Sequence, residues 1–293
     1  MRFFELQAVI LAGGLGTRLR PLTYKVPKPM VDINGAPFLE IKLRDMLRRG
    51  IRDYVFCVGY LGKIVEEYFG DGSRFGARIR YSYDGEKLLG PIGALKNAQN
   101  LLNEDFIVTY GDNYVDVNYH EMAKKLRESG ALGVMAVLYN RNRWGKSDAD
   151  VRDGYVVAYS KHSDKGFEWI NYGVFALRKE ALELARSGEE EEFFNELISR
   201  RELLAFEVSK RFYDVGSHDS LEEFRRLFTE GNMHSASLNC TAGNLIVSSH
   251  LRCPRTVISV GNFHVYRLDS LSKAFFPSKM EFPFRLNCSL VGS

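Results

Sequence analysis

The stretch from Leu11 to Met30 carries the residues best suited to bind a phosphate. It reads LAGGLGTRLRPLTYKVPKPM, so an apolar run leads into Gly13, Gly14 and Gly16. Glycines let backbone N–H groups approach a phosphate or a nucleobase, because no Cβ stands in the way. A polyanion such as a triphosphate would suit the cations that follow. These cations are Arg18, Arg20, Lys25 and Lys28.

The spacing in this stretch excludes two familiar phosphate-binding loops. A Walker P-loop needs GxxxxGK followed by Ser or Thr, which is absent here. The dinucleotide fingerprint needs GxGxxG, and the third glycine is missing after Gly16. A simple strand-to-loop turn with solvated cations is the alternative for a short glycine loop, but the whole string is more specific than that.

Two aspartates stand where chain geometry favours ligand binding. Asp112 follows the apolar run Asp105–Tyr110, and Asp214 follows another apolar stretch shortly before Gly216. Open α/β sheets bind ligands at the carboxyl ends of their strands. A lone aspartate there is more often a turn or a helix cap. Two together could hold one Mg²⁺, which typically takes one or two carboxylates with phosphate and water.

Alternating strand and helix patterns would position these residues. Ser220 and Glu223 have the spacing of a capping box before the last helix. The alternation predicts an α/β fold with a mostly parallel sheet that is covered on both faces. We expect strands over 6–11, 53–58, 77–83, 105–110, 133–139, 154–160, 169–177 and 203–208, and helices over 37–49, 62–69, 92–102, 119–129, 179–186, 190–201 and around 220–228.

The overall composition indicates a globular protein of the cytoplasm. The 293 residues are 45% hydrophobic and 26% charged, which is enough apolar material for a sizeable core. A net charge of +3 is too small to suggest a nucleic-acid partner. The chain has no apolar run of membrane-spanning length and no signal-peptide pattern. Its cysteines show neither disulfide-framework nor zinc spacing, so we expect a reducing compartment.

Residues 231–293 differ in composition from the rest of the chain. They hold six basic and two acidic residues, a net +4, and subtracting this from the total of +3 leaves −1 for residues 1–230. We therefore expect one domain over 1–230 and a C-terminal extension over 231–293. The sequence does not determine the structure or role of this extension. The protein could form a homo-oligomer.

The string GGxGTRLxPLT…PKPM resembles the signature of the sugar-1-phosphate nucleotidyltransferases, which join an NTP to a sugar 1-phosphate and release pyrophosphate. The resemblance covers roughly residues 5–229. In the glycine loop LGPIGAL, Pro91 and Ile92 replace the Thr and Ala of the family's LGTAGAL. Later family motifs follow in order, namely LGPIGAL at 89–95, YGD at 110–112, DGYVVAYSK at 153–161, EWINYGVF at 168–175 and YDVG at 213–216.

The resemblance implies roles for individual residues. Arg18 would bind the leaving β- and γ-phosphates and Lys28 the α-phosphate, while Asp112 and Asp214 would hold Mg²⁺. Lys161 would bind the sugar phosphate, with Lys165 as a rival. The sugar would also contact Glu168, Asn171 and Gly173. The nucleotide would lie against Leu11, Gly13, Gly14, Gly16, Thr17, Gly90 and Gly93.

The resemblance also implies a Rossmann-like, three-layer α/β fold with a mixed, mostly parallel central sheet. We expect an enzyme that uses an NTP and a sugar 1-phosphate. Our narrow prediction is guanylyl transfer to a heptose or mannose 1-phosphate. Thymidylyl or uridylyl transfer to a glucose-type or muramic sugar 1-phosphate is the alternative. A regulatory subunit that binds NDP-sugars without turnover is an alternative of another class. The anionic sugar phosphate needs no general base, so catalysis would depend on positioning and charge.

Overall fold

A computed structural model describes residues 6–162, 166–229, 245–246, 257–260 and 265–267 of the chain. The chain divides into two compact units, Met1–Ala236 and Ser237–Ser293. In the second unit the described strands form an antiparallel sheet in the order β14-β15-β16. Their bounds are Leu245–Ile246, Val257–Val260 and Val265–Arg267. The expected boundary at 230/231 and most of the expected extension lie outside the described residues.

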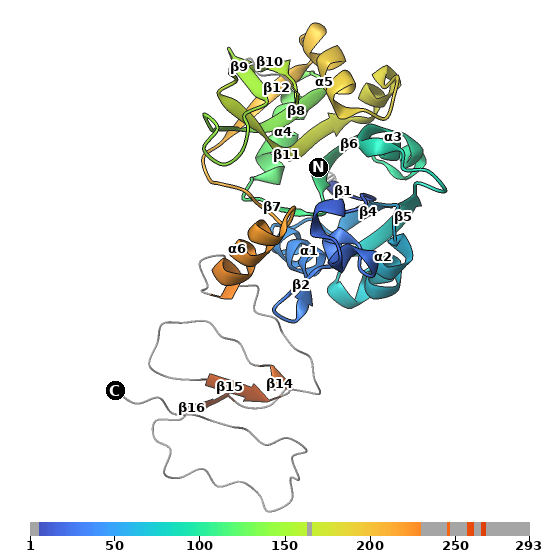
Figure 1. Cartoon of the computed structure of the whole chain (residues 1–293), viewed down its shortest axis with the longest axis vertical. Coiled ribbons are helices and arrows are strands. Elements are labelled where there is room, and N and C mark those ends of the chain that lie inside the picture. The colour runs from blue at the N-terminus through green and yellow to red at the C-terminus, as the bar shows by residue number, and fades with distance from the viewer. Residues whose placement is uncertain (1–5, 163–165, 230–244, 247–256, 261–264, 268–293) are drawn as a thin grey trace, which may run out of the picture. The chain divides into compact units, whose positions relative to one another are not determined.

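The first unit is built on a nine-stranded mixed sheet (Figure 1). Its strand order is β5-β4-β1-β6-β11-β8-β12-β10-β9. The strands are β1 (Gln7–Ala12), β4 (Asp53–Val58), β5 (Arg78–Tyr83), β6 (Asp105–Tyr110), β8 (Gly133–Tyr139), β9 (Ala149–Arg152), β10 (Tyr155–Tyr159), β11 (Trp169–Arg178) and β12 (Leu203–Val208).

The sheet is parallel in one half and mixed in the other. The strands β5, β4, β1 and β6 pair in parallel, as do β8 and β12. The strand β11 is antiparallel to both of its neighbours, and β10 is antiparallel to β12 and β9. The strand β11 also pairs with β9 in antiparallel fashion, so five of the nine strand pairs described in this sheet are antiparallel, more than the alternating pattern predicts. A tight turn joins β9 to β10 directly, and such a turn can join only antiparallel strands.

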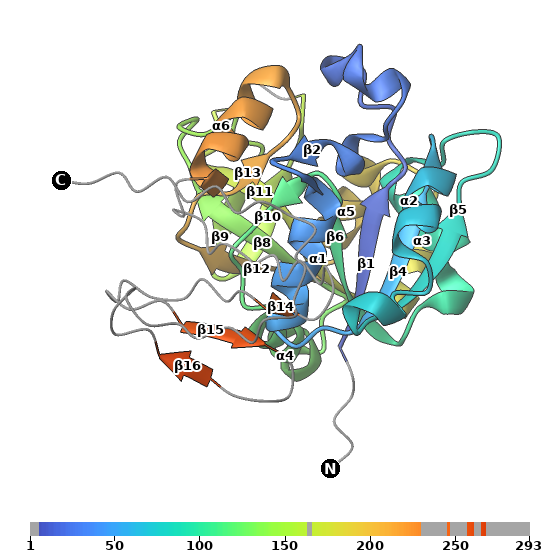
Figure 2. The same ribbon diagram turned by 90° about the horizontal axis from the view of Figure 1, so that it is seen from below.

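Helices cover both faces of the sheet, which gives the expected α/β sandwich (Figures 1 and 2). Alternate residues of β1 explain the two layers, since Ala8 and Ile10 pack in one core and Val9 in the other. The first core contains side chains of α1 (Phe38–Arg48), α2 (Gly62–Phe69) and α4 (Tyr119–Ser129). The second contains side chains of α3 (Gly90–Asn97) and α5 (Glu190–Ser199).

A third apolar cluster brings the last helix back to the start of the chain. The helix α6 (His218–Thr229) packs Phe224 against Phe38 of α1, with the ring centroids 5.0 Å apart. Its N-terminus differs from the predicted capping box. Ser217 accepts the hydrogen bond of the Ser220 backbone N–H (3.3 Å), while Glu223 pairs with Arg211. The helix therefore begins earlier in the chain than a cap at Ser220 implied.

Short elements that the patterns did not reveal complete the unit. The hairpin β2 (Asp32–Ile33) with β3 (Ala36–Pro37) and the pair β7 (Asn113–Tyr114) with β13 (Tyr213–Asp214) are each made of two-residue strands. The expected helix over 179–186 is a 3-10 helix, Lys179–Leu184. Other 3-10 turns span Thr17–Leu19, Leu22–Tyr24, Lys28–Met30, Ser73–Phe75 and Gln99–Leu101. Among the described residues, no helix combines the length and apolar character needed to cross a bilayer.

Candidate active site

The glycine-rich loop leaves the carboxyl end of β1 and folds back on itself. After Ala12 the chain passes through three short 3-10 turns, the last of which begins at Lys28. The hydroxyl of Thr23 donates to the carbonyl of Gly16 (2.8 Å) and ties the second turn to the loop. This folding returns Lys28 to the glycines, so that it lines two cavities together with Gly14.

The larger cavity has a volume of about 200 Å³ and an apolar floor. Four of the residues predicted to bind the nucleotide line it, namely Leu11, Gly13, Gly14 and Gly90. Its remaining lining residues are Ala12, Lys28, Pro29, Cys57, Asp84, Leu88, Pro91, Ala94, Tyr110 and Asp112.

The second cavity, of about 190 Å³, holds the predicted phosphate-binding residues. It shares Gly14, Lys28 and Asp112 with the first, so the two cavities adjoin. Its other lining residues are Gly16, Thr17, Arg18 and Gly216. Gly93 belongs to neither lining. A Cβ there would lie 3.0 Å from the Cβ of Leu89 and 3.4 Å from the Cα of Gly188, so Gly93 serves close packing beside the site.

Lys28 and Asp112 form an ion pair at the junction of the two cavities. Their side chains are 13% and 29% exposed, so both face into the site and are partly shielded from solvent. An incoming phosphate would compete with Asp112 for Lys28, and a metal ion would compete with Lys28 for Asp112. Either ligand would therefore break this ion pair.

Asp214 comes to the same region through the β7–β13 pair. It lies opposite Asn113, and the Val215 backbone N–H donates to the carbonyl of Asp112 (3.0 Å). One carboxylate oxygen of Asp214 accepts from the Gly216 N–H (2.5 Å) and the Ser220 hydroxyl (3.1 Å). A Cβ at Gly216 would lie 2.5 Å from that oxygen and 3.0 Å from Nη2 of Arg18. Arg18 and Asp214 therefore flank Gly216.

The two aspartates would suit a hydrated divalent metal ion better than a metal ion held entirely by protein. Among the described residues, no group of three or more His, Cys, Asp or Glu side chains could enclose a metal ion. Mg²⁺ usually keeps several waters and takes one or two carboxylates together with substrate phosphates. The carboxylates of Asp112 and Asp214, near the glycine-rich loop, would be a donor set of that kind.

A buried carboxylate accepts hydrogen bonds from two of the residues predicted to bind the sugar phosphate. Glu190, 3% exposed at the start of α5, accepts from Nζ of Lys161 (3.1 Å) and Nδ2 of Asn171 (3.1 Å). It also accepts from the hydroxyls of Tyr159 (2.5 Å) and Tyr110. Tyr110 lines the larger cavity, so this cluster adjoins that cavity.

Burial raises the pKa of Glu190 to about 8, and the adjacent carboxylate of Glu191 acts in the same direction. Burial also lowers the pKa of Lys161. Both shifts favour the uncharged form of each group, so the pair is less ionic than its geometry alone implies.

The other predicted sugar-site residues divide between this cluster and the surface. Asn171 accepts the Gly173 N–H through Oδ1 (2.8 Å), which links Gly173 to the cluster. The side chain of Glu168 is 47% exposed and accepts from Arg141 Nε (2.9 Å) and the Tyr139 hydroxyl (3.2 Å), partners that it does not share with Glu190. Lys165, the rival of Lys161, lies outside the described residues.

Glu190 and Asp84 are site residues that the sequence did not reveal. Glu190 stands in the run Glu189–Glu192, where four identical residues give no sign of which one is buried. Asp84 lies between Tyr83 and Gly85 and reads as an ordinary turn residue. The rotation of α5 buries Glu190, and the packing of the Gly13 loop places Asp84 beside the cavity. Neither placement can be inferred from the spacing of residues in the sequence.

Taken together, the sheet, the glycine loop and the charged groups at the strand ends define an α/β enzyme that transfers a phosphate-containing group. The two adjoining cavities, lined by Arg18, Lys28 and Asp112, lie at the carboxyl ends of β1 and β6. This is where open α/β sheets bind nucleotides.

The comparisons with known proteins make this class specific. Residues 7–231 match the family model described as "Nucleotidyl transferase". The chain is 31% identical over 222 residues to D-glycero-alpha-D-manno-heptose 1-phosphate guanylyltransferase of Campylobacter jejuni, covering 75% of this chain and 98% of that protein. It is 29% identical to UTP–glucose-1-phosphate uridylyltransferase of Synechocystis, covering 67% of this chain but only 55% of that protein.

A solved structure shows the same fold. HddC from Yersinia pseudotuberculosis, also solved in complex with GMP-PN, aligns with a TM-score of 0.62 at 27% identity, covering 76% of this chain and 99% of that one. The chain belongs to the nucleotidyl transferase family. The resemblance to sugar-1-phosphate nucleotidyltransferases, and with it the assignment as an enzyme, is confirmed. Enzymes of this family generally use a divalent metal ion.

Proposed function

We propose that this enzyme transfers a guanylyl group from GTP to a heptose or mannose 1-phosphate, with Mg²⁺ as the metal ion. The carboxylate of Asp84, beside Gly13 in the larger cavity, carries this proposal. A Cβ at position 13 would lie 2.9 Å from Oδ2 of Asp84, so glycine is what allows the carboxylate to occupy this place. Asp84 also accepts weakly from the Leu89 N–H (3.4 Å).

A carboxylate here matches guanine better than the other bases. Guanine presents two adjacent donors, its N1–H and its 2-amino group, and a carboxylate only accepts. Uracil and thymine present carbonyl oxygens on both sides of a single N–H, which a carboxylate would repel. Burial raises the pKa of Asp84 above its usual value, as expected for a carboxylate that has lost solvent and awaits donors.

The relatives support the same choice of base and sugar. The Campylobacter relative is named as a heptose 1-phosphate guanylyltransferase, and mannose-1-phosphate guanylyltransferases also match this chain at 28–29% identity. The Synechocystis relative is named as a uridylyltransferase, so UTP is the alternative nucleotide to be tested.

The proposed mechanism assigns each charged residue one task. The phosphate oxygen of the sugar 1-phosphate attacks the α-phosphorus of GTP, and the bond to the leaving pyrophosphate breaks. Lys28 would exchange Asp112 for the α-phosphate, and Arg18 would bind the departing β- and γ-phosphates. Lys161 would exchange Glu190 for the sugar phosphate, while Asn171 and Gly173 would position the sugar. These residues bring together two anions that repel each other in water.

Asp112 and Asp214 would hold Mg²⁺. The metal ion would offset the charge of the phosphates.

The test is pyrophosphate release with each of ATP, GTP, CTP, UTP and dTTP, crossed with heptose, mannose, glucose and amino-sugar 1-phosphates. We expect release only with GTP and a heptose or mannose 1-phosphate together. Release with UTP or dTTP would refute the guanylyl assignment. If no pair reacts while NDP-sugars still raise the melting temperature, the chain is a binding subunit.

The variant Asp84→Asn tests the base-reading role. We expect the preference for GTP over UTP to fall by about 10- to 100-fold, because the amide replaces one of the two acceptor oxygens with an NH₂ donor. Glu86→Gln is the matched control, since Glu86 is exposed in the same turn. An unchanged preference in Asp84→Asn would remove Asp84 from base recognition.

A further inference from the structure

Lys42 is a buried lysine that the proposed mechanism does not use. It lies in the middle of α1, on the apolar stripe formed by Leu39, Leu43 and Met46, and is 2% exposed. Burying an ammonium group costs several kcal/mol unless hydrogen bonds and nearby charges compensate. Burial lowers the pKa of Lys42 to about 7, although the charges of Asp112 and Asp45 oppose the shift.

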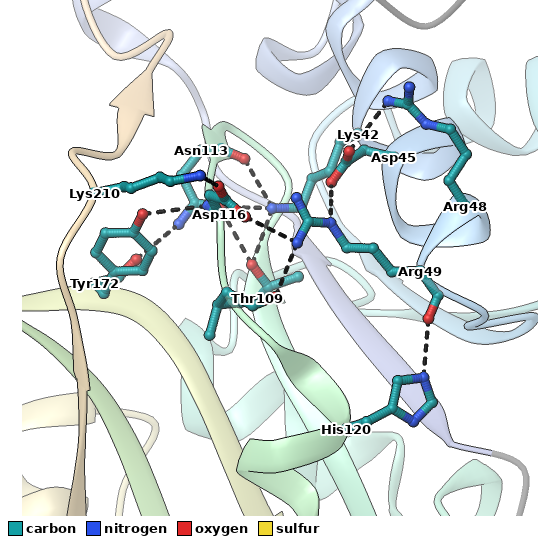
Figure 3. A network of polar contacts seen from close by, with 11 residues as sticks. Lys42, Asp45, Arg48, Arg49, Thr109, Asn113, Asp116, His120, Tyr172 and Lys210 are labelled. Carbon is teal, nitrogen blue, oxygen red and sulfur yellow. Dashed lines mark hydrogen bonds and ion pairs between the residues drawn. The ribbon is translucent and has the colours of Figure 1, made fainter. Parts of the chain in front are cut away.

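All three hydrogens of the Lys42 ammonium have an acceptor (Figure 3). Nζ donates to Oγ1 of Thr109 (3.0 Å), to the carbonyl of Asn113 (2.8 Å) and to Oδ1 of Asn113 (2.7 Å). These acceptors lie on either side of Asp112, at the end of β6 and the start of β7. The lysine therefore closes the turn that carries the predicted metal ligand, without touching that ligand itself.

The contacts continue from Asn113 to the sugar side of the site. Nδ2 of Asn113 donates to the carbonyls of Tyr172 (3.4 Å) and Gly173 (3.3 Å) on β11. Gly173 has φ = +72°, and a Cβ there would lie 2.4 Å from Nδ2 of Asn113. The backbone of Asn113 also pairs with Asp214. The ammonium thus joins α1 to β6 and β7, and the side chain of Asn113 extends the connection to β11.

We propose that Lys42 is a positioning residue of the catalytic centre, holding the Thr109–Asn113 turn so that Asp112 meets Asp214 and, through Asn113, fixing the Gly173 segment. The proposal rests on the proposed function, because Asp112, Asp214 and Gly173 have roles only in that reaction. A well-packed apolar side chain usually serves stability as well as a buried charge does. What an apolar residue lacks is three directed donors, which here set the shape of one turn.

The test compares Lys42→Met with Lys125→Met. Lys125 is the matched control, because it is a partly buried lysine on α4 with one backbone acceptor, Ala205 (2.7 Å), away from the site. Mn²⁺ affinity is measured by calorimetry on the full chain without nucleotide, and steady-state constants are measured with the most active NTP and sugar phosphate pair.

For Lys42→Met we expect the Mn²⁺ affinity and kcat each to fall about 10- to 100-fold, the range seen when groups that orient metal ligands are removed. The KM for the sugar phosphate should rise, while the KM for the NTP stays within about twofold, since Lys42 does not support the glycine loop. Lys125→Met should leave all of these quantities unchanged. A folded Lys42→Met with wild-type Mn²⁺ affinity and sugar KM would overturn the proposal.

Asn113→Asp decides the matter if Lys42→Met does not fold. It keeps both acceptors for Lys42 but cannot donate to Tyr172 and Gly173. We expect a folded protein with a raised sugar KM, and an unchanged KM would overturn the Asn113 link. Absence of turnover in the wild type would count against the proposed function alone, because the Mn²⁺ affinities would still test the positioning role.

Discussion

Replacing Glu190 by glutamine should change how the stability of the protein depends on pH. The pKa of Glu190 is about 8 in the folded protein because of burial, against an ordinary value of 4.5 in an unfolded chain. Between these values the folded state binds one more proton than the unfolded state, so the free energy of unfolding falls as pH rises. The stabilisation is complete below the unfolded pKa and is lost as pH rises through the folded pKa.

The size of the effect follows from the shift. Each pH unit inside the window costs about 1.4 kcal/mol, so the wild type should lose about 3 kcal/mol from this group between about pH 5.5 and about pH 7.5. The amide in Glu190→Gln cannot titrate and keeps the shape of the side chain. The stability of Glu190→Gln relative to wild type should therefore rise by about 3 kcal/mol over the same range.

The measurement is urea unfolding followed by circular dichroism at a series of pH values. Glu196→Gln is the control on the same helix, because hydrogen bonds from Arg200 hold the pKa of Glu196 below its usual value. Glu196 is ionised in both states over this range, and its variant should run parallel to wild type. If the free energy of unfolding of Glu190→Gln also changes with pH in parallel to that of the wild type, the Lys161 ammonium at 3.1 Å keeps Glu190 ionised. The reasoning from burial then fails.

Three further outcomes are expected. Asp112→Asn should lower kcat/KM by at least about 100-fold at saturating Mg²⁺, because it weakens a metal ligand worth several kcal/mol; near-wild-type turnover would remove Asp112 from the metal site. Gly173→Ala should destabilise the protein by about 1–3 kcal/mol in urea unfolding, because φ is +72° and the new Cβ meets Asn113; unchanged stability would show that the segment can shift freely. Glu168→Ala should change the sugar KM by less than about twofold, because its exposed pair with Arg141 stands apart from the Glu190 cluster; a tenfold rise would place Glu168 on the sugar.

Local sequence was sufficient for the elements with strong periodicity. The strands Asp53–Val58, Asp105–Tyr110, Gly133–Tyr139 and Leu203–Val208 and the helix Tyr119–Ser129 have the bounds that the patterns predict. These elements end at turn residues, namely Gly59, Gly111 and Gly130, or at polar residues. Two-residue strands such as β7 and β13 are too short to show an alternation of apolar and polar residues. They are recognised only by their pairing with each other in the folded chain.

The sequence motif identified the charged residues of the candidate site, but the tertiary structure determines which residues they contact. The glycine loop predicted Arg18 and Lys28, but Lys28 pairs with Asp112 only because the 3-10 turns return the chain to β6. Lys42 did leave a signal, since it interrupts an apolar stripe at helical spacing. That signal does not say which oxygens would surround the ammonium.

The sequence by itself determined the family, the α/β alternation and the glycine-rich loop with its cations, because these depend on residue type and on neighbours within a few positions. The tertiary structure decided which of four consecutive glutamates became the buried Glu190, that Asp84 of the Tyr83–Gly85 turn region came to line the larger cavity beside Gly13, and how Lys42 reached both sides of Asp112. The physical reason is that burial and hydrogen bonding join residues far apart in the chain, such as Lys42 and Asn113, and no local pattern encodes that distance.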